Sequence, residues 1–176
     1  MMTLISKIDV ARYDSPLGTL SLASVHQRLV HLDFEENDDR LHLISSRRFK
    51  NIDWCDSSFA PLSVLAWLDA YFAGRVMPLP MADIDLRGTD FQKSVWQALI
   101  EIPAGTHVSY GGLAASLGNS KAVRAVARAN ALNPVSIIVP CHRVIGTDGT
   151  LTGYAGGLAR KKWLLDYEAE MTRKHA

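Results

Sequence analysis

Residues 109–131 read SYGGLAASLGNSKAVRAVARANA, a pattern that predicts two short helices joined by a tight turn. Ser109 can cap the first helix, because a serine hydroxyl accepts an amide hydrogen that the first turn leaves without a partner. Gly118 suits the position just after a helix, where the backbone often becomes left-handed. Asn119 or Ser120 can cap the second helix. Two helices around a short turn that contains glycine are typical of a helix-turn-helix.

The second helix, expected over residues 121–131, is unusually rich in alanine. Alanine is the best helix former, which alone could explain this composition. Its small side chain also lets a helix approach a partner closely, and Arg124 and Arg128 lie four residues apart on one face. The pattern therefore leaves two interpretations open, a plain stable helix and a helix that contacts DNA.

The segments around this pair of helices carry signals of their own. Thr89 and Gln92 have the spacing of a capping box, which predicts a helix from residue 90 onward. Residues 135–139 are mostly β-branched, which predicts a buried strand. Asp148-Gly149 predicts the hairpin turn of a wing. Residues 158–170 predict a final helix.

The first half of the chain predicts a sheet and a helix. Alternating apolar residues over 5–34 are typical of an antiparallel meander. Residues 61–72 predict a helix, because proline suits a first helical turn and a glycine follows shortly after the last one. The segment 76–87 contains two prolines and little pattern. We therefore expect a domain boundary there, with domains over 1–86 and 87–176.

Composition excludes several classes of protein. The chain has 176 residues, of which 48% are hydrophobic and 21% charged, an ordinary globular composition that argues against disorder. No stretch approaches the roughly 18 apolar residues of a membrane span. The N-terminal residues lack the basic start and apolar stretch of a secretory signal, so we expect a cytoplasmic protein. The only cysteines, Cys55 and Cys141, cannot build a disulfide framework or a four-thiolate zinc site.

Charge is divided unevenly between the two halves. Residues 1–86 carry 8 basic and 12 acidic residues, a net charge of −4, and subtraction from the totals of 19 and 18 leaves 11 and 6, or +5, for residues 87–176. Between residues 104 and 165 seven basic residues face one acidic residue, Asp148. Such asymmetry indicates either a half that binds a polyanion or a solvated basic face.

A candidate nucleophile follows the apolar run directly, in Pro140-Cys141-His142-Arg143. The cations of His142 and Arg143 would favour a thiolate at Cys141. Neighbours in an extended segment point to opposite faces, so a bridging water is an alternative to a direct bond between Cys141 and His142. A base of this kind also needs an orienting acid. The residues leave six acids open in this half: Asp90, Glu101, Asp148, Asp166, Glu168 and Glu170.

The segment Ile138–Ile145, IVPCHRVI, resembles the active-site segment of the O6-alkylguanine-DNA alkyltransferases, or methylated-DNA–protein-cysteine methyltransferases. The likeness covers residues 89–168 in order and without large gaps, and weaker matches reach into the first half. The size of the chain is similar to that of the constitutive bacterial type. Other matching segments are Val108-Ser109-Tyr110, Arg124-Ala125-Val126, Asn133-Pro134, Gly153-Tyr154-Ala155-Gly156-Gly157 and Lys161-Lys162-Trp163-Leu164-Leu165.

This resemblance implies a fold of α/β (α+β) class in two parts. Residues 1–86 would form a ribonuclease-H-like domain, an antiparallel sheet with a helix. Residues 87–176 would form a helix-turn-helix domain of winged-helix-like form that binds DNA and accepts the alkyl group.

The resemblance also implies the chemistry. Cys141 would accept the alkyl group of O6-alkylguanine, and of O4-alkylthymine, in double-stranded DNA, once per molecule. A proton path would run from Cys141 through a water to His142 and on to Glu168. Asn133 would brace the active-site turn. Tyr110 would donate a hydrogen bond to the leaving base as negative charge builds on it.

Further roles follow from how the family reaches its target. The base is flipped out of the duplex, and Arg124 would fill the gap that it leaves. The second helix docks in the minor groove, where alanines permit close approach. The residues expected at the DNA are Ser109, Ala122, Arg124, Ala125, Arg128 and Ala129, and those expected around the base are Tyr110, Val144, Tyr154, Ala155 and Gly156. The human-type enzyme has serine where this chain has Ala155, so a backbone N–H would replace the hydroxyl contact.

The resemblance implies no cofactor and no metal, and we expect a monomer that binds DNA and no membrane. Two other functions stand beside this one. Non-catalytic alkyltransferase-like proteins bind lesions but lack the cysteine, so Cys141 argues against that class. A cysteine hydrolase built on Cys141, His142 and an acid would turn over repeatedly and would leave the basic helix-turn-helix without a purpose.

Overall fold

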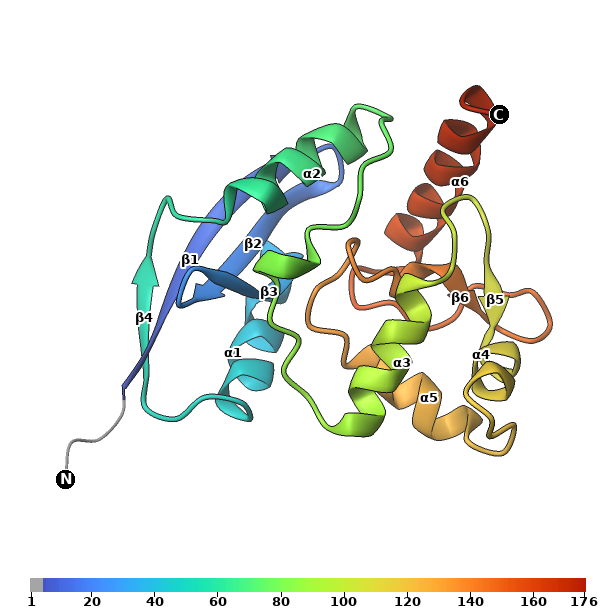
Figure 1. The fold of residues 1–176 in the computed structure, drawn as a ribbon, viewed down its shortest axis with the longest axis horizontal. Helices are drawn as coiled ribbons and strands as arrows, with labels where there is room; N and C mark the ends of the chain where they lie inside the picture. The colour runs from blue at the N-terminus through green and yellow to red at the C-terminus, as the bar shows by residue number, and fades with distance from the viewer. Residues whose placement is uncertain (1–4) are drawn as a thin grey trace. The chain divides into compact units, whose positions relative to one another are not determined.

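The computed structural model describes residues 5–176, which divide after Arg87 into two compact units (Figure 1). The first unit holds a four-stranded sheet with helices, and the second is mainly helical. The chain is therefore a mixed α/β protein, as its sequence predicts.

The sheet of the first unit has the strand order β3-β2-β1-β4. Its first three strands form the predicted antiparallel meander, and Gly18, with φ of 113°, closes the turn between the first two. The fourth strand pairs parallel with β1, so the sheet is mixed rather than purely antiparallel. The strands are β1 (Ser6–Ser15), β2 (Gly18–Val25), β3 (Arg28–Phe34) and β4 (Ile52–Asp56).

Two helices cover opposite faces of this sheet. Helix α1 (Asp38–Ser46) shares a buried cluster with Val10 of β1. Helix α2 (Leu62–Phe72) follows Pro61, as predicted, and its Asp69 accepts a hydrogen bond of 2.7 Å from Tyr13 of the same strand. Val10 and Tyr13 are an odd number of positions apart and so point to opposite faces. Short 3-10 helices lie at η1 (Glu35–Asn37) and η2 (Met81–Asp83).

The second unit begins with a capped helix that anchors the others. In helix α3 (Asp90–Ile100) the hydroxyl of Thr89 accepts the amide hydrogen of Gln92, and the side chain of Gln92 accepts that of Thr89, which confirms the predicted capping box. Trp96 is fully buried, and its indole donates a 2.9 Å hydrogen bond to the carbonyl of Ala129. This bond joins α3 to the helix that contains Ala129.

The predicted helix-turn-helix is present as α4 (Tyr110–Ser116) and α5 (Val123–Ala131). Ser109 caps α4 by accepting the amide hydrogen of Gly112 at 3.0 Å, as predicted. The expected cap of α5 is wrong, because Ala122 occupies that position and makes no side-chain bond. Asn119 instead accepts an amide hydrogen inside the preceding turn.

Two elements after the helix-turn-helix differ from prediction. Residues 135–139 are buried turns rather than a strand, and Ile137 has a left-handed φ of 71°. Asp148-Gly149 does form a turn, but β6 (Val144–Ile145) pairs parallel with β5 (Val108–Ser109) and not across that turn. The chain ends in η3 (Cys141–Arg143), β6 and the long helix α6 (Leu158–Lys174), which extends past the predicted end.

Candidate active site

Cys141 opens η3 at the end of the buried turns and is 5% exposed. Asn133 holds this segment at both ends. Its amide nitrogen donates to the carbonyl of Val139 at 2.7 Å, and its side-chain oxygen accepts the amide hydrogen of Val135 at 3.0 Å. Since the amide of Cys141 also donates to the carbonyl of Val139, the asparagine fixes the backbone that presents the thiol.

His142 and Glu168 form a fully buried pair between η3 and α6. The Nε2 atom of His142 lies 2.9 Å from Oε1 of Glu168. Burial lowers the pKa of His142 despite this carboxylate, so the imidazole is neutral near pH 7. A carboxylate only accepts hydrogen bonds, so Nε2 carries the hydrogen and Nδ1 keeps its lone pair. The resting pair therefore leaves a basic nitrogen on the other side of the ring.

That nitrogen is placed to receive a proton. Nδ1 of His142 is buried and has no hydrogen-bond partner among residues 5–176. A buried polar atom of this kind is commonly satisfied by an ordered water. A water at Nδ1 could connect the imidazole to the neighbouring thiol of Cys141, which is the path that the resemblance implies.

Arg143 forms an ion pair with Glu168. Its guanidinium donates to both carboxylate oxygens of Glu168, each at 2.8 Å, and to the carbonyl of Ile102. Burial alone would raise the pKa of Glu168, but hydrogen bonds and charge from His142 and Arg143 lower it well below its usual range. The charge of Arg143 thus helps to keep Glu168 ionised, while its expected effect on the thiolate of Cys141 stays a prediction.

Lys161 is a buried cation that interacts electrostatically with Cys141, and the sequence patterns did not predict this role. The residue is fully buried, and its ammonium donates to the carbonyls of Val144, Thr152 and Gly153. Burial lowers the pKa of Lys161 to about 8, while the charge of Cys141 opposes that shift. One signal could have revealed this lysine, because it lies seven residues before Glu168 and thus on the same face of α6.

Tyr110 and the loop that follows β6 surround the remaining side of the site. The hydroxyl of Tyr110 donates to the carbonyl of Thr152 at 3.4 Å, and the ring of Tyr154 meets His142 edge-on with centroids 6.4 Å apart. Burial, then the charge of Cys141, raises the pKa of Tyr110, so its phenol stays protonated. Gly156 is buried and its carbonyl accepts from Arg160, whereas Ala155 is exposed.

The residues predicted at the DNA divide between two faces of α5. Arg124, Ala125 and Arg128 are exposed, and Ala122 is half-buried just before the helix. Ala129 is 2% exposed and lies toward α3, so its side chain is not available to a partner, which corrects the expectation for this residue. Ser109, half-buried, uses its hydroxyl as the helix cap.

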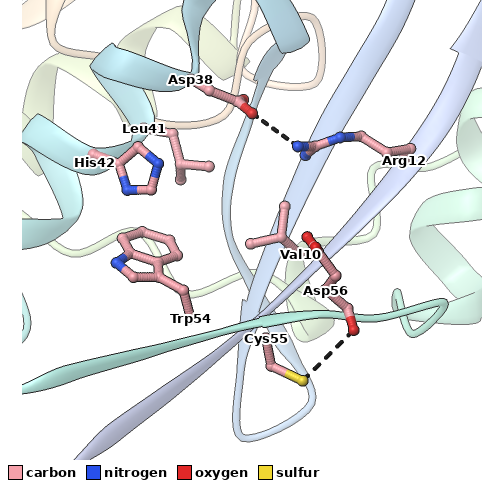
Figure 2. A pocket seen from close by; sticks show the side chains of 8 residues that line it. All are labelled: Val10, Arg12, Asp38, Leu41, His42, Trp54, Cys55 and Asp56. Carbon is pink, nitrogen blue, oxygen red and sulfur yellow. Dashed lines mark hydrogen bonds and ion pairs between the residues drawn. The ribbon is translucent and has the colours of Figure 1, made fainter.

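The first unit holds a pocket of its own, of about 140 Å³, beside α1 and β4 (Figure 2). His42 stands edge-on to Trp54 there, and the thiol of Cys55 donates to the backbone carbonyl of Asp56 at 3.6 Å.

Across the part of the chain that the structure describes, no three His, Cys, Asp or Glu side chains lie close enough to hold a metal ion. Among the same residues, none of the helices is both long and apolar enough to cross a membrane.

Comparison with known proteins places these residues in a family. Residues 90–170 match "6-O-methylguanine DNA methyltransferase, DNA binding domain", and residues 10–86 match "6-O-methylguanine DNA methyltransferase, ribonuclease-like domain". The methylated-DNA–protein-cysteine methyltransferase of Methanosarcina barkeri is 44% identical over 91% of this chain and 96% of its own length. The Salmonella typhimurium protein of that name is 44% identical over 88% of this chain and 91% of its own.

A solved structure agrees with these relatives. Mycobacterium tuberculosis OGT in complex with DNA superimposes with a TM-score of 0.79 at 43% identity, covering 93% of this chain and 94% of that chain. The resemblance that the sequence motifs predict is thus confirmed along nearly the whole length. The chain belongs to the 6-O-methylguanine DNA methyltransferase family.

Proposed function

We propose that this chain repairs alkylated DNA by moving the alkyl group of O6-alkylguanine, and of O4-alkylthymine, onto the sulfur of its own Cys141. The observation that carries the proposal is the buried pair of His142 and Glu168 directly beside a cysteine on a braced turn. The names of the relatives and the DNA complex of the M. tuberculosis protein support the same activity.

The first step makes the nucleophile. A water carries the proton of the Cys141 thiol to Nδ1 of His142, and the carboxylate of Glu168 stabilises the imidazolium that results. This assignment is supported by the neutral resting imidazole and by the orientation that Glu168 gives it. The ammonium of Lys161 favours the thiolate by charge.

The second step transfers the alkyl group. The thiolate of Cys141 attacks the alkyl carbon in line with O6, so a carbon–sulfur bond forms as the carbon–oxygen bond breaks. The electron pair of the broken bond stays on the guanine, which becomes anionic. Tyr110, held protonated by its raised pKa, donates a hydrogen bond to that base as the charge develops. The imidazolium of His142 then gives back, through water, the proton that it took from the thiol. The guanine becomes neutral and leaves the site, and a thioether remains at Cys141.

DNA engagement falls to α5 in this proposal. Arg124, Ala125 and Arg128 form its exposed face. This face suits the minor groove because the side chain of Ala125, beside the two arginines, is small. Arg124 occupies the place of the flipped base, and phosphate contacts make binding salt-dependent. The base lies among Tyr110, Tyr154, Ala155 and Gly156, whereas Val144, which was expected beside it, is fully buried and supports the site from behind. No cofactor is needed, the protein acts as a monomer, and a reducing compartment such as the cytoplasm keeps the acceptor a thiol.

One experiment tests the proposal directly. The protein is incubated with a duplex that contains a single O6-methylguanine, and the masses of the protein and of the DNA are then measured by mass spectrometry. We expect one methyl group on the peptide that contains Cys141, restored guanine in the DNA and no turnover beyond one equivalent. The Cys141→Ser variant should bind the duplex and transfer nothing. Methyl groups that stay on the DNA beside intact, reduced wild-type protein would overturn the proposal.

A further inference from the structure

Asn130 is a buried asparagine on the inner side of α5. The residue is 3% exposed, and its amide nitrogen lies 3.5 Å from the hydroxyl of Tyr110, to which it donates. Its side-chain oxygen is buried and has no hydrogen-bond partner in the described part of the chain. A buried acceptor without a partner is destabilising, so an apolar side chain of this size would serve packing better. The half-satisfied amide therefore points to a role beyond packing.

The bond from Asn130 meets the one side chain that the proposed reaction uses as a donor to the base. The phenol oxygen of Tyr110 receives the hydrogen of Asn130, while its own hydrogen goes to the carbonyl of Thr152. The carbonyl of Thr152 also accepts a hydrogen bond of 2.7 Å from the ammonium of Lys161. It therefore keeps a donor when the hydroxyl of Tyr110 turns to the substrate. Both bonds to the hydroxyl are long, as is common at a site without its substrate.

We infer that Asn130 is a positioning residue for Tyr110: its amide donates to the phenol oxygen and so strengthens the hydrogen bond that the phenol gives to the departing guanine. This inference rests on the proposed function. A donor to the phenol oxygen polarises the O–H bond, because hydrogen bonds in a chain reinforce one another. It also stabilises the negative charge that the phenol oxygen gains as its hydrogen shifts toward the base.

Two further observations support the assignment. The hydrogen bond from Asn130 lowers the pKa of Tyr110, against the larger effect of burial, which raises it. Asn130 also lies two residues after Arg128 on the helix whose exposed face carries Arg124 and Arg128. The helix proposed to meet the DNA thereby carries, on its inner side, the support for the residue that meets the base.

The test is a double-mutant cycle on the rate of methyl transfer at saturating duplex in a single turnover. The four proteins are wild type, Asn130→Leu, Tyr110→Phe and the double variant. We expect Asn130→Leu to be about five- to tenfold slower, the change that one neutral hydrogen bond supports, with unchanged affinity for the duplex. In the Tyr110→Phe background the same substitution should have no further effect, because the phenol oxygen is absent.

Two more variants control for changes in packing and for the direction of the hydrogen bond. Asn130→Ala should give the same pattern if leucine disturbs the packing. Asn130→Asp, whose carboxylate only accepts hydrogen bonds, should be slower than Asn130→Leu because it draws the phenol hydrogen away from the base. Three results would overturn the inference while wild-type transfer stands. Asn130→Leu could transfer as fast as wild type, it could lose the same factor in rate in the wild-type and Tyr110→Phe backgrounds, or Asn130→Asp could transfer faster than Asn130→Leu. Absence of transfer by the wild type would instead overturn the proposed function, and this inference with it.

Discussion

The Nε2 atom of His142 lies 2.9 Å from Oε1 of Glu168, and neither side chain is exposed to solvent. The same carboxylate receives two hydrogen bonds from Arg143. One buried acid thus orients the base of the proposed reaction and neutralises the cation that ties α6 to the carbonyl of Ile102. In the proposed reaction this one carboxylate serves both catalysis and stability, and separate measurements can distinguish the two contributions.

Replacing Glu168 by glutamine should lower both the stability of the protein and the rate of alkyl transfer. The Glu168→Gln variant leaves the guanidinium of Arg143 buried without a counter-charge, which costs about 3–5 kcal/mol of unfolding free energy. It also removes the charge that stabilises an imidazolium at His142, so transfer should slow by about 100-fold, the range of a lost general base. Urea unfolding and single-turnover transfer measure the two effects. Glu170→Gln, on an exposed position of the same helix, is the matched control and should change neither.

A second histidine should govern acid stability. His31 is 1% exposed, and neither ring nitrogen has a hydrogen-bond partner within residues 5–176. Burial, with the charges of Arg40 and Arg48, lowers its pKa from 6.5 to about 3. The folded protein therefore keeps His31 neutral in that range, whereas the unfolded chain binds a proton below about pH 6.5. Each unit of acidification between these values should remove about 1.4 kcal/mol of stability, and none should be lost to this group above pH 6.5.

The His31→Phe variant tests this slope. It keeps a ring in the same space but cannot titrate, so its free energy of unfolding should fall less steeply than that of wild type between about pH 6 and 4. Urea unfolding at several pH values gives the difference, in which the contributions of Asp33 and other carboxyls cancel. Parallel curves for wild type and His31→Phe would contradict the prediction.

Local signals predicted most of the fold, and tertiary contacts account for what they missed. The caps at Thr89 and Ser109 depend on residues three positions apart, so sequence alone suffices for them. The β-branched run 135–139 favours extended backbone by local propensity, but Asn133 bonds to both of its ends and holds it as the compact turns that support Cys141. In β4 only Ile52 and Trp54 alternate with a polar residue, too short a pattern to define a strand from sequence, and the pairing with β1 defines it.

The site divides in the same way. The position of Cys141 and its neighbour His142 could be read from the sequence, whereas the choice among six acids depended on the family resemblance. Glu168 lies 26 residues from His142, and only the fold of α6 against η3 brings them together. Lys161 was missed because a lysine in a helix is expected at the surface, and here three backbone carbonyls hold it in the interior.

Lys161 should contribute to both stability and the thiolate. The Lys161→Met variant keeps the stem of the side chain but removes the ammonium that donates to the carbonyls of Val144 and Thr152, which costs about 1–3 kcal/mol. It also removes the charge that favours the thiolate of Cys141, so transfer near neutral pH should slow and recover in part at alkaline pH. The control is Lys162→Met, an exposed neighbour paired with Asp166. A variant whose transfer rate loses the same factor at every pH would exclude the electrostatic role.

Arg124 allows base flipping to be separated from chemistry. It is exposed on α5, and the proposal places it in the gap that the flipped base leaves. Extrusion of a base costs a few kcal/mol, so Arg124→Ala should slow transfer from a duplex by about 100-fold. Transfer from free O6-methylguanine, which needs no flipping, should be unchanged, since Arg124 makes no contribution to the thiolate in this proposal. Arg124→Lys keeps the charge but not the planar group, so it should bind the duplex like wild type and still transfer slowly.

Arg128→Ala provides the contrasting case on the same helix. This residue is also exposed, and the proposal gives it a phosphate contact rather than a place in the base stack. Its loss should weaken duplex binding and reduce the slope of log affinity against log salt by about one. At saturating duplex the transfer rate should match wild type, because the base is still extruded and Cys141 still reacts. If instead Arg124→Ala and Arg128→Ala both lowered affinity and left the saturated rate intact, the two arginines would share a purely electrostatic role and the gap would be filled by another group.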